Sequence, residues 1–328
     1  MEPQKELVSQ QLVRHPHPNE LYDAPIDLRE LYKSLWRGKW VVIAITFVFA
    51  VGSVAYALSL PNIYKADALL SPAESTGGGG LSKMAGQFGG LAALAGVNLG
   101  GGGSSQTDLA VQVMKSRQFA EAFIEKHDLL VPLMAAKGWD LNKNQLILDD
   151  EIYNSTTNEW VREPDGLRGS KPTAQEAYEV FSKNTLSVNQ DEETGLYRVS
   201  VEHFSPYLAQ KWVNWLIEDI NKVMRERTIS EASQNLTYLN TQLQKTSVAE
   251  MQSTFYSLVE EQTKSLMLAE VQDEFIFKTV DPAVVPELKS SPNRALICVV
   301  GTLLGGIFGM IIILVRYSFK EDEDKQSA

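Results

Sequence analysis

The chain has 328 residues, 22 glycines, a single cysteine and a formal net charge of -11 at pH 7. This acidic balance argues against nucleic acid as a partner, because nucleic-acid binding usually needs a basic face. One cysteine, Cys298, cannot form a disulfide within the chain.

The N-terminal 39 residues form a polar arm. Residues 1–25 contain four prolines and few large apolar residues, which predicts disorder. Residues 26–40, "IDLRELYKSLWRGKW", mix apolar and basic residues. They predict either a short amphipathic helix on the membrane surface or an N-terminal extension of the helix that follows. The pattern does not separate the two.

Two charge-free apolar runs stand out, at residues 40–60 and 295–315. As helices, runs of about 20 residues cross a hydrocarbon core of about 30 Å. We therefore predict two transmembrane helices rather than buried core helices. Ala55-Tyr56-Ala57 resembles a signal-peptide cleavage site, but the polar arm before it is longer than a usual n-region, which favours an uncleaved anchor.

Basic residues set the expected orientation. Four of them crowd the approach to the first run, while Lys65 stands nearly alone after it. By the positive-inside rule, both termini are expected in the cytoplasm. The two spans are expected to contact membrane lipids. The expected organisation is a cytoplasmic arm, a first span, a periplasmic domain, a second span and a cytoplasmic tail, at residues 1–39, 40–60, 61–294, 295–315 and 316–328.

Local patterns along the domain predict an α+β fold. Residues 63–72, "IYKADALLSP", indicate a strand, and residues 107–129 a helix with Asp108 near its start. Residues 137–172 indicate a loop with short strands. A helix running into a strand, a turn at 193–195 with a strand after it, and a strand in "FIFKTVDPA" complete the expected elements.

A long helical run is expected between Tyr207 and Asp281, which contains neither proline nor glycine. If continuous it would reach about 100 Å, so we expect a break where the apolar phase shifts between Leu243 and Val248. Apolar residues at helical spacing form a candidate seam for packing between protomers, or equally an intramolecular core. The seam residues on the first part of the run are Leu236, Leu239 and Leu243.

Residues 77–103 form a glycine-rich stretch with two runs of four glycines. It lacks both the P-loop and the G-x-G-x-x-G spacing, so it does not predict a nucleotide site. It is either a disordered linker or, as we prefer, an apolar glycine-flanked element that rests on the membrane or on a neighbour. The element's apolar residues at helical spacing include Met84, Phe88, Leu91 and Leu94.

No catalytic, cofactor or metal site is indicated. The four histidines lack metal-ligand spacing, and the acidic runs at 149–151 and 191–193 are typical of solvated turns. No serine or cysteine nucleophile motif occurs. We therefore expect a protein that is not an enzyme.

The second apolar run carries Gly301, Gly305 and Gly309, each four residues apart and so on one helix face. This small-xxx-small pattern favours close helix packing in lipid. Pro282, Pro286 and Pro292 hold the preceding segment extended, and Arg294 can anchor at the headgroups.

The segment "AVVPELKSSPNRALICVVGTLLGG" resembles the membrane-proximal motif of the Wzz-type chain-length determinants, the polysaccharide co-polymerases of Gram-negative inner membranes. Their pattern is A-x-x-P-x-x-P-x-x-P-x-R, to which Ala283, Pro286, Pro292 and Arg294 correspond, while Lys289 replaces the middle proline. "IYKADALLSP", "VMKSRQFAEAFIEKHDL" and "GGLAALAG" are also similar, and the order of spans and domain matches nearly the whole chain.

This resemblance implies a protomer with a membrane-proximal α/β base and a long helix projecting from it, assembled into a ring. It implies a non-catalytic regulator of polysaccharide chain length, acting with the membrane polymerase on lipid-linked polysaccharide. Lipopolysaccharide O-antigen is the expected polymer, with capsule, exopolysaccharide or a common-antigen-like polymer as alternatives. Some relatives carry a tyrosine kinase after the second span, for which the 13-residue tail is too short. A sensory receptor would need a cytoplasmic output module, for which neither the N-terminal arm nor the C-terminal tail is large enough. A structural adaptor of an export system is the rival class of function.

Overall fold

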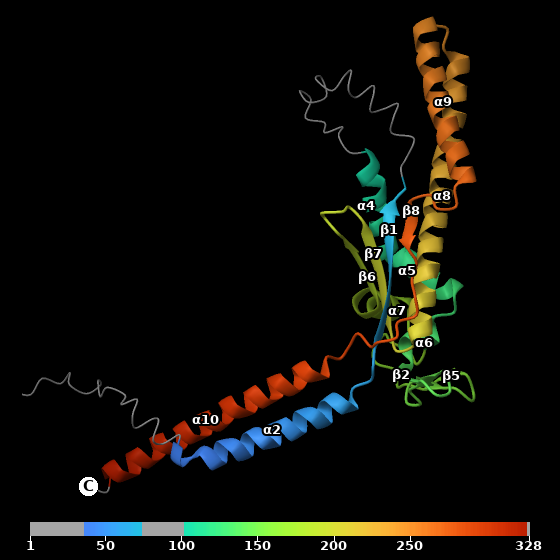
Figure 1. The fold of residues 1–328 in the computed structure, drawn as a ribbon. Coiled ribbons are helices and arrows are strands. Elements are labelled where there is room, and N and C mark those ends of the chain that lie inside the picture. The colour runs from blue at the N-terminus through green and yellow to red at the C-terminus, as the bar shows by residue number, and fades with distance from the viewer. Residues whose placement is uncertain (1–35, 74–101, 327–328) are drawn as a thin grey trace, which may run out of the picture. The chain divides into compact units, whose positions relative to one another are not determined.

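The computed structural model describes residues 36–73 and 102–326, with backbone only for 102–105 and 317–326. It divides into two compact units, which are considered separately: residues 36–57 with 294–326, and residues 58–293. Figure 1 shows the elements of both. The predicted N-terminal arm up to residue 35 lies outside the described residues. So does the glycine-flanked element with Met84, Phe88, Leu91 and Leu94.

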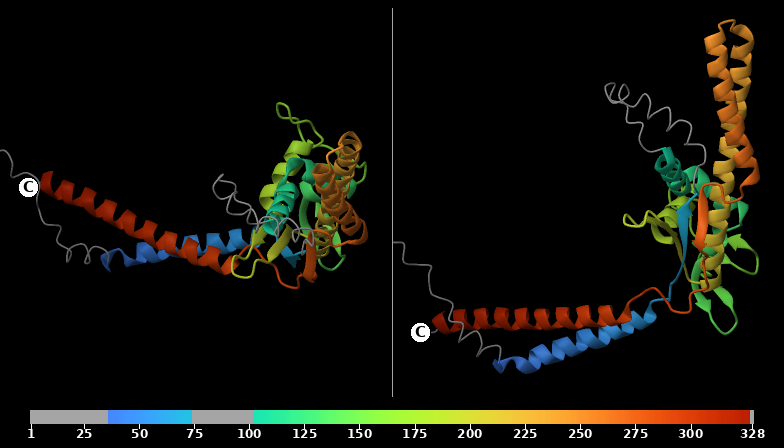
Figure 2. Two further views of the ribbon diagram at one scale, coloured as in Figure 1. Left: turned by 90° about the horizontal axis from the view of Figure 1, so that it is seen from above. Right: turned by 45° about the horizontal axis from the view of Figure 1, so that its top comes forward.

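The first unit consists of α2 (Lys39–Ser59) and α10 (Arg294–Gln326), which run side by side (Figures 1 and 2). Both are long and apolar enough to cross a membrane. The predicted spans at 40–60 and 295–315 coincide with these helices to within one residue, except at the end of α10. That helix continues to Gln326 because the polar sequence after Val315 contains no proline or glycine to end it.

The second unit is built on a four-stranded antiparallel sheet with strand order β6-β7-β1-β8. Its strands are β1 (Tyr64–Pro72), β6 (Leu186–Gln190), β7 (Tyr197–His203) and β8 (Phe277–Asp281). Tyr64 lies opposite His203, and Leu70 lies opposite Thr279. The α+β fold class predicted from the sequence is confirmed, and each strand expected for this sheet forms.

One face of the sheet is covered by helices. Ala66, Ala68 and Leu70 alternate with more exposed residues along β1, as expected for a strand with one buried face. The N-terminal part of α8 (Pro206–Lys245) packs against this face through Trp212 and Leu216, both fully buried. Helices α4 (Gly102–Lys115) and α5 (Arg117–Lys126) complete the core.

The helix expected over residues 107–129 is two helices, α4 and α5. Ser116 separates them because its backbone is extended and its hydroxyl accepts a hydrogen bond from the amide of Phe119, which caps the start of α5. Helix α4 also begins earlier than expected, at Gly102. A short helix, α6 (Leu130–Met134), follows.

The region predicted as a loop with short strands contains two hairpins and returns to the sheet through a helix. The hairpins pair β2 (Ala136–Asp140) with β3 (Gln145–Leu148) and β4 (Tyr153–Asn154) with β5 (Glu159–Trp160). The chain then enters α7 (Ala174–Val180) and a π-helical turn, η1 (Phe181–Thr185), before β6.

The long helical run is a hairpin. Helix α8 has 40 residues, about 60 Å at 1.5 Å per residue, and α9 (Ala249–Val271) returns beside it. The break expected between Leu243 and Val248 falls at Thr246–Val248, where Thr246 and Val248 have extended backbone angles. The far half of α8 and all of α9 project beyond the sheet (Figure 2).

Candidate functional site

The described residues contain no group of three or more His, Cys, Asp or Glu side chains that could hold a metal ion. The predicted site residues fall instead into three sets: the glycines of the second apolar run, the proline segment before it, and the leucines of the long hairpin.

Helices α2 and α10 meet along the glycine face. A β-carbon added to Gly301 would lie 2.5 Å from Cβ of Ser53, and one added to Gly305 would lie 2.6 Å from Cβ of Phe49. At Gly309 the nearest atom would be Cα of Val42, at 3.1 Å. Real β-carbons do not approach other atoms below 3.0 Å, so Gly301 and Gly305 permit a backbone approach that alanine would obstruct.

The residues that face one another run in opposite chain directions. Gly38 meets Ile313 near one end of the pair, and at the other end Nε of Arg294 donates a hydrogen bond to the carbonyl oxygen of Ala57 at 3.0 Å. The Phe49 and Phe308 rings also meet, with centroids 5.9 Å apart. The two helices therefore form an antiparallel pair over most of their apolar length.

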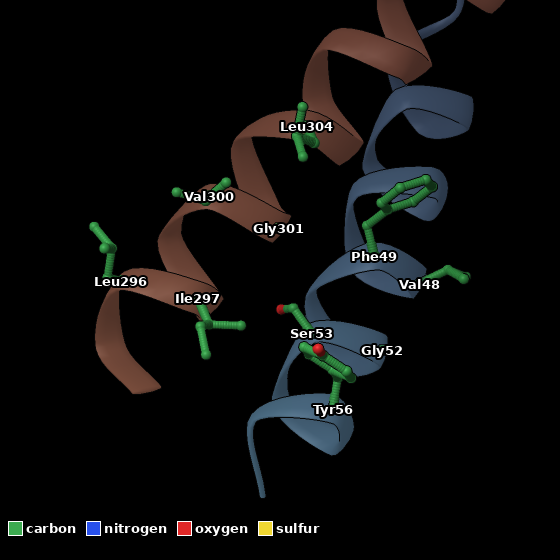
Figure 3. Close-up of a pocket in the computed structure, with 10 residues that line it drawn as sticks. All are labelled: Val48, Phe49, Gly52, Ser53, Tyr56, Leu296, Ile297, Val300, Gly301 and Leu304. Carbon is green, nitrogen blue, oxygen red and sulfur yellow. The ribbon is translucent and has the colours of Figure 1, made fainter. Parts of the chain in front are cut away.

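Beside this seam lies an open apolar groove of about 650 Å³ (Figure 3). Residues of α2, including Gly52 and Tyr56, line one side, and residues of α10, including Leu296 and Val300, line the other. A β-carbon added to Gly52 would meet nothing within 4 Å. Unlike Gly301 and Gly305, Gly52 is not required for contact between the two helices.

The proline segment lies along the start of the sheet. The amide of Ile63 donates to the carbonyl of Ser291 at 2.9 Å, and the amide of Ser290 donates to the carbonyl of Ile63 at 2.9 Å. Ala283 is buried, and its carbonyl accepts a hydrogen bond from Nε2 of Gln210 at 3.0 Å. Pro286 and Pro292 are half-buried. The structure thus ties this segment to β1 and α8 at several points.

The leucine stripe lies on the far part of α8, which runs beside α9 (Figure 1). Leu239 is buried, and Leu236 and Leu243 are half-buried, in the part of α8 that packs on α9. On α9, Phe255 is half-buried, whereas Met251 and Leu258 are exposed. Leu239 is thus covered within one chain, whereas Leu236 and Leu243 keep part of their surface exposed, and packing between protomers through this stripe stays a prediction.

Sequence reasoning missed a buried ionic contact between α5 and α8. Asp219, only 5% exposed, forms an ion pair with Lys126, and its Oδ2 lies at hydrogen-bond distance, 2.9 Å, from Nε2 of His127. The His127 ring stacks on Trp215 with centroids 4.1 Å apart. A single aspartate in an amphipathic helix gives no signal for this contact, because its partners lie about 90 residues away.

His203 is buried in the core of the domain. The amide of Ser205 donates to its Nδ1, and its Nε2 lies 3.0 Å from the carbonyl oxygen of Pro132. Burial lowers the pKa of His203 below its usual value. The ring is therefore neutral, with its proton on Nε2 donated to Pro132.

Two sequence-family models match the chain. The model "Wzz: Chain length determinant protein" matches residues 24–127, and the model "GNVR: G-rich domain on putative tyrosine kinase" matches residues 237–318. The first match covers α2, β1, α4 and α5. The second covers the end of α8, then α9, β8, the proline segment and most of α10. A search of curated protein sequences finds no match.

Among solved structures, a "full-length bacterial polysaccharide co-polymerase" is similar, with 15% sequence identity over 90% of this chain and 99% of that chain and a TM-score of 0.36. A "Fragment of WzzB, Polysaccharide Co-polymerase from Salmonella Typhimurium" has 13% identity over 70% and 99%, with a TM-score of 0.28.

The two sequence-family models account for both ends of the domain and for both apolar helices, which are the parts that carried the resemblance in the sequence. The Wzz family is non-catalytic, in agreement with the expectation that the chain is not an enzyme. The chain belongs to the Wzz family of polysaccharide chain-length determinants, with a GNVR domain at its C-terminal side.

Proposed function

We propose that this chain sets the modal length of lipopolysaccharide O-antigen, as an oligomeric scaffold in the inner membrane of a Gram-negative cell. The observation that carries the proposal is the match of the Wzz model to residues 24–127, which covers the first apolar helix and the first strand of the domain. The paired apolar helices α2 and α10 support it, because they bracket the domain in sequence.

The proposed topology has both termini in the cytoplasm and residues 61–294 in the periplasm. Its support is the basic approach to α2, with Arg29, Lys33, Arg37 and Lys39, against a single lysine just after it. Polymerisation of lipid-linked repeats would then take place on the side of the membrane where the domain lies.

The proposed mechanism is a scaffold rather than a reaction. A ring of protomers would hold the membrane polymerase near its growing lipid-linked product. Chain length would depend on how long the ring, the polymerase and the product remain together. Helix α8 alone is about 60 Å long, so a ring of these helices could accompany a polymer for many sugar units.

The test is the lipopolysaccharide ladder on a gel, from cells with and without the gene for this chain and with the native polymerase in both. We expect deletion to turn a cluster of bands into a random ladder, and the wild-type chain on a plasmid to restore the cluster. An unchanged ladder would rule out O-antigen as the polymer.

Secreted and capsular polysaccharides from the same strains are sized alongside. A change confined to one of these would assign the chain to capsule or exopolysaccharide instead. If no polymer changes in length, the rival class of a structural adaptor in an export system is favoured.

A further inference from the structure

A second groove lies in the domain, between α8 and the connection that leads from α9 into β8. Its volume is about 530 Å³, within the range of about 300–1,000 Å³ typical of small-ligand sites. Besides Ile217 and Asn221, the α8 wall presents the side chains of Asn214, Glu218, Lys222 and Arg225. They are three or four residues apart, so they form one stripe about 17 Å long on the helix.

The lower part of this groove is held by bonds within the fold. Nη1 of Arg225 lies 2.9 Å from Oδ1 of Asp273, and Oε1 of Glu274 accepts a hydrogen bond from the amide of Thr279 at 3.0 Å. Asn221 is buried and bonded to the start of β8. Of these contacts, those of Arg225 and Asn221 join α8 to the opposite wall.

Three other polar groups in the groove make no hydrogen bond within the described residues. Asn214 and Glu218 are exposed, and across residues 36–73 and 102–326 neither side chain has a hydrogen bond or an ion pair. The ammonium group of Lys222 forms an ion pair with Glu226 on the same helix at 3.9 Å, which is beyond hydrogen-bond distance and leaves its N–H donors unused. An amide, a carboxylate and an ammonium group therefore remain available along one face.

The charges in the groove nearly cancel, since Lys222 and Arg225 oppose Glu218, Asp273 and Glu274. Neither a polyanion nor a polycation is favoured by such a balance. A ligand rich in hydroxyl groups suits it better, because each hydroxyl both donates and accepts. Buried Ile217 and exposed Pro282 add an apolar part to the lining, which can contact the C–H face of a sugar ring.

We propose that this groove binds a saccharide segment of the polymer whose length the chain controls. The proposal rests on the proposed function, because that function brings a polysaccharide to the domain. The amide of Asn214 and the ammonium of Lys222 would donate to sugar hydroxyl oxygens, and the Glu218 carboxylate would accept from sugar hydroxyls. Binding along α8 would keep a product segment beside the projecting hairpin.

The experiment measures binding to the full chain in lipid nanodiscs by isothermal titration calorimetry. The probes are the O-polysaccharide released by mild acid from the cells' own lipopolysaccharide, and their secreted polysaccharide. The test variant is Asn214→Ala/Lys222→Ala. The matched control is Asn240→Ala/Lys245→Ala, which removes the same two residue types from exposed positions further along α8.

We expect one of the two polysaccharides to bind the wild-type chain and the control equally. The test variant should bind at least fivefold more weakly while keeping the same thermal unfolding midpoint. A smaller loss, an equal loss in the control, or no binding of either polysaccharide by the wild-type chain would overturn the proposal.

These outcomes are separate from those of the gene deletion. A chain that alters the ladder but binds neither polysaccharide would retain the proposed function and lose the groove. A chain that binds as expected but whose deletion changes no polymer would retain the groove and lose the proposed function.

Discussion

Asn221 joins α8 to the strand that closes the sheet. Its Oδ1 accepts hydrogen bonds from the amides of Ile276 and Phe277 at 2.8 and 3.0 Å. Its Nδ2 donates to the carbonyl oxygens of Phe277 and Ile217, both at 3.1 Å. All these groups are buried, so one side chain satisfies polar atoms that would otherwise be costly to bury.

We predict that Asn221→Leu lowers the free energy of unfolding by at least about 3 kcal/mol. Two amides and a carbonyl at the start of β8 lose their partner, at about 1–3 kcal/mol for each unsatisfied group. Chemical denaturation of the detergent-solubilised chain measures the change. Asn240→Leu, at an exposed position of the same helix, is the control; equal effects of the two would contradict the role of Asn221.

The pairing of Glu176 with Arg162 makes part of the stability dependent on pH. The guanidinium binds both carboxylate oxygens, at 2.6 and 3.0 Å, and this hydrogen bonding lowers the pKa of Glu176 to about 2. A carboxyl whose pKa is lower in the folded state than its usual 4.5 stabilises the fold above pH 4.5. That contribution is lost as the pH falls from about 4.5 to 2.

We therefore predict that Glu176→Gln is less stable than the wild-type chain at pH 7 by about 2 kcal/mol, as for a charge-assisted pair. The difference should shrink as the pH falls toward 2, because the wild-type carboxyl becomes neutral there. Unfolding midpoints at pH 7, 4 and 2.5 measure this. A difference that stays constant across that range would show that Glu176 does not contribute through its charge.

Among the helices, the seam between α2 and α10 offers a matched pair of glycines. A β-carbon at Gly305 would lie 2.6 Å from Phe49, whereas one at Gly306 would have its nearest contact at 3.8 Å, with Oγ1 of Thr46. The two glycines are adjacent, so composition and depth along the helix are the same.

We predict that Gly305→Ala separates the helices and Gly306→Ala does not. Oxidative cross-linking of Phe49→Cys with Phe308→Cys, in a Cys298→Ser background, reports their proximity, since these rings are 5.9 Å apart. The yield should fall at least threefold with Gly305→Ala. Equal yields for the two glycine variants would mean that the close approach at Gly305 is not needed.

The hairpin of α8 and α9 is expected to open separately from the sheet. Leu239 is buried between the two helices, and truncating a buried leucine costs about 2–5 kcal/mol. Leu239→Ala should speed hydrogen exchange over the far half of α8 and over α9, while β1 and β7 stay protected. Tyr238→Ala, at a 63% exposed neighbour, should change neither region.

Helices and strands were predicted well from the sequence where the pattern that indicates them lies in consecutive residues. Period-two alternation in β1 and the apolar runs of α2 and α10 are carried by consecutive residues, and these elements were predicted closely. The two-helix form of residues 102–126 depends on the conformation of Ser116, which a serine in a helical pattern does not reveal. The direction of α9 was not predicted, because a phase shift indicates a break but not its angle.

For the whole molecule, we predict that the domain lies in the periplasm and the C-terminal tail in the cytoplasm. In a Cys298→Ser background, a cysteine at Leu167, which is fully exposed, should react with a membrane-impermeant maleimide once the outer membrane is permeabilised. A cysteine at Ser327 should react only after lysis. The opposite pattern would place the domain in the cytoplasm.

Candidate sites, like helices and strands, could be predicted from the sequence only where their residues lie close together in the chain. The glycine face of α10 could be inferred from spacing alone, because a four-residue repeat defines a helix face. The groove between α8 and β8 could not, since Glu218 and Glu274 come from segments more than 50 residues apart. Only the fold brings them together.

The strand order has a consequence for how the protein is made. Strand β1 emerges first from the ribosome, and its partner β8 is synthesised about 200 residues later. Until then one edge of β1 has unpaired amide and carbonyl groups, which can pair with other chains. A polypeptide released before residue 277 would keep that edge open, so premature termination should yield products for degradation rather than shorter working regulators.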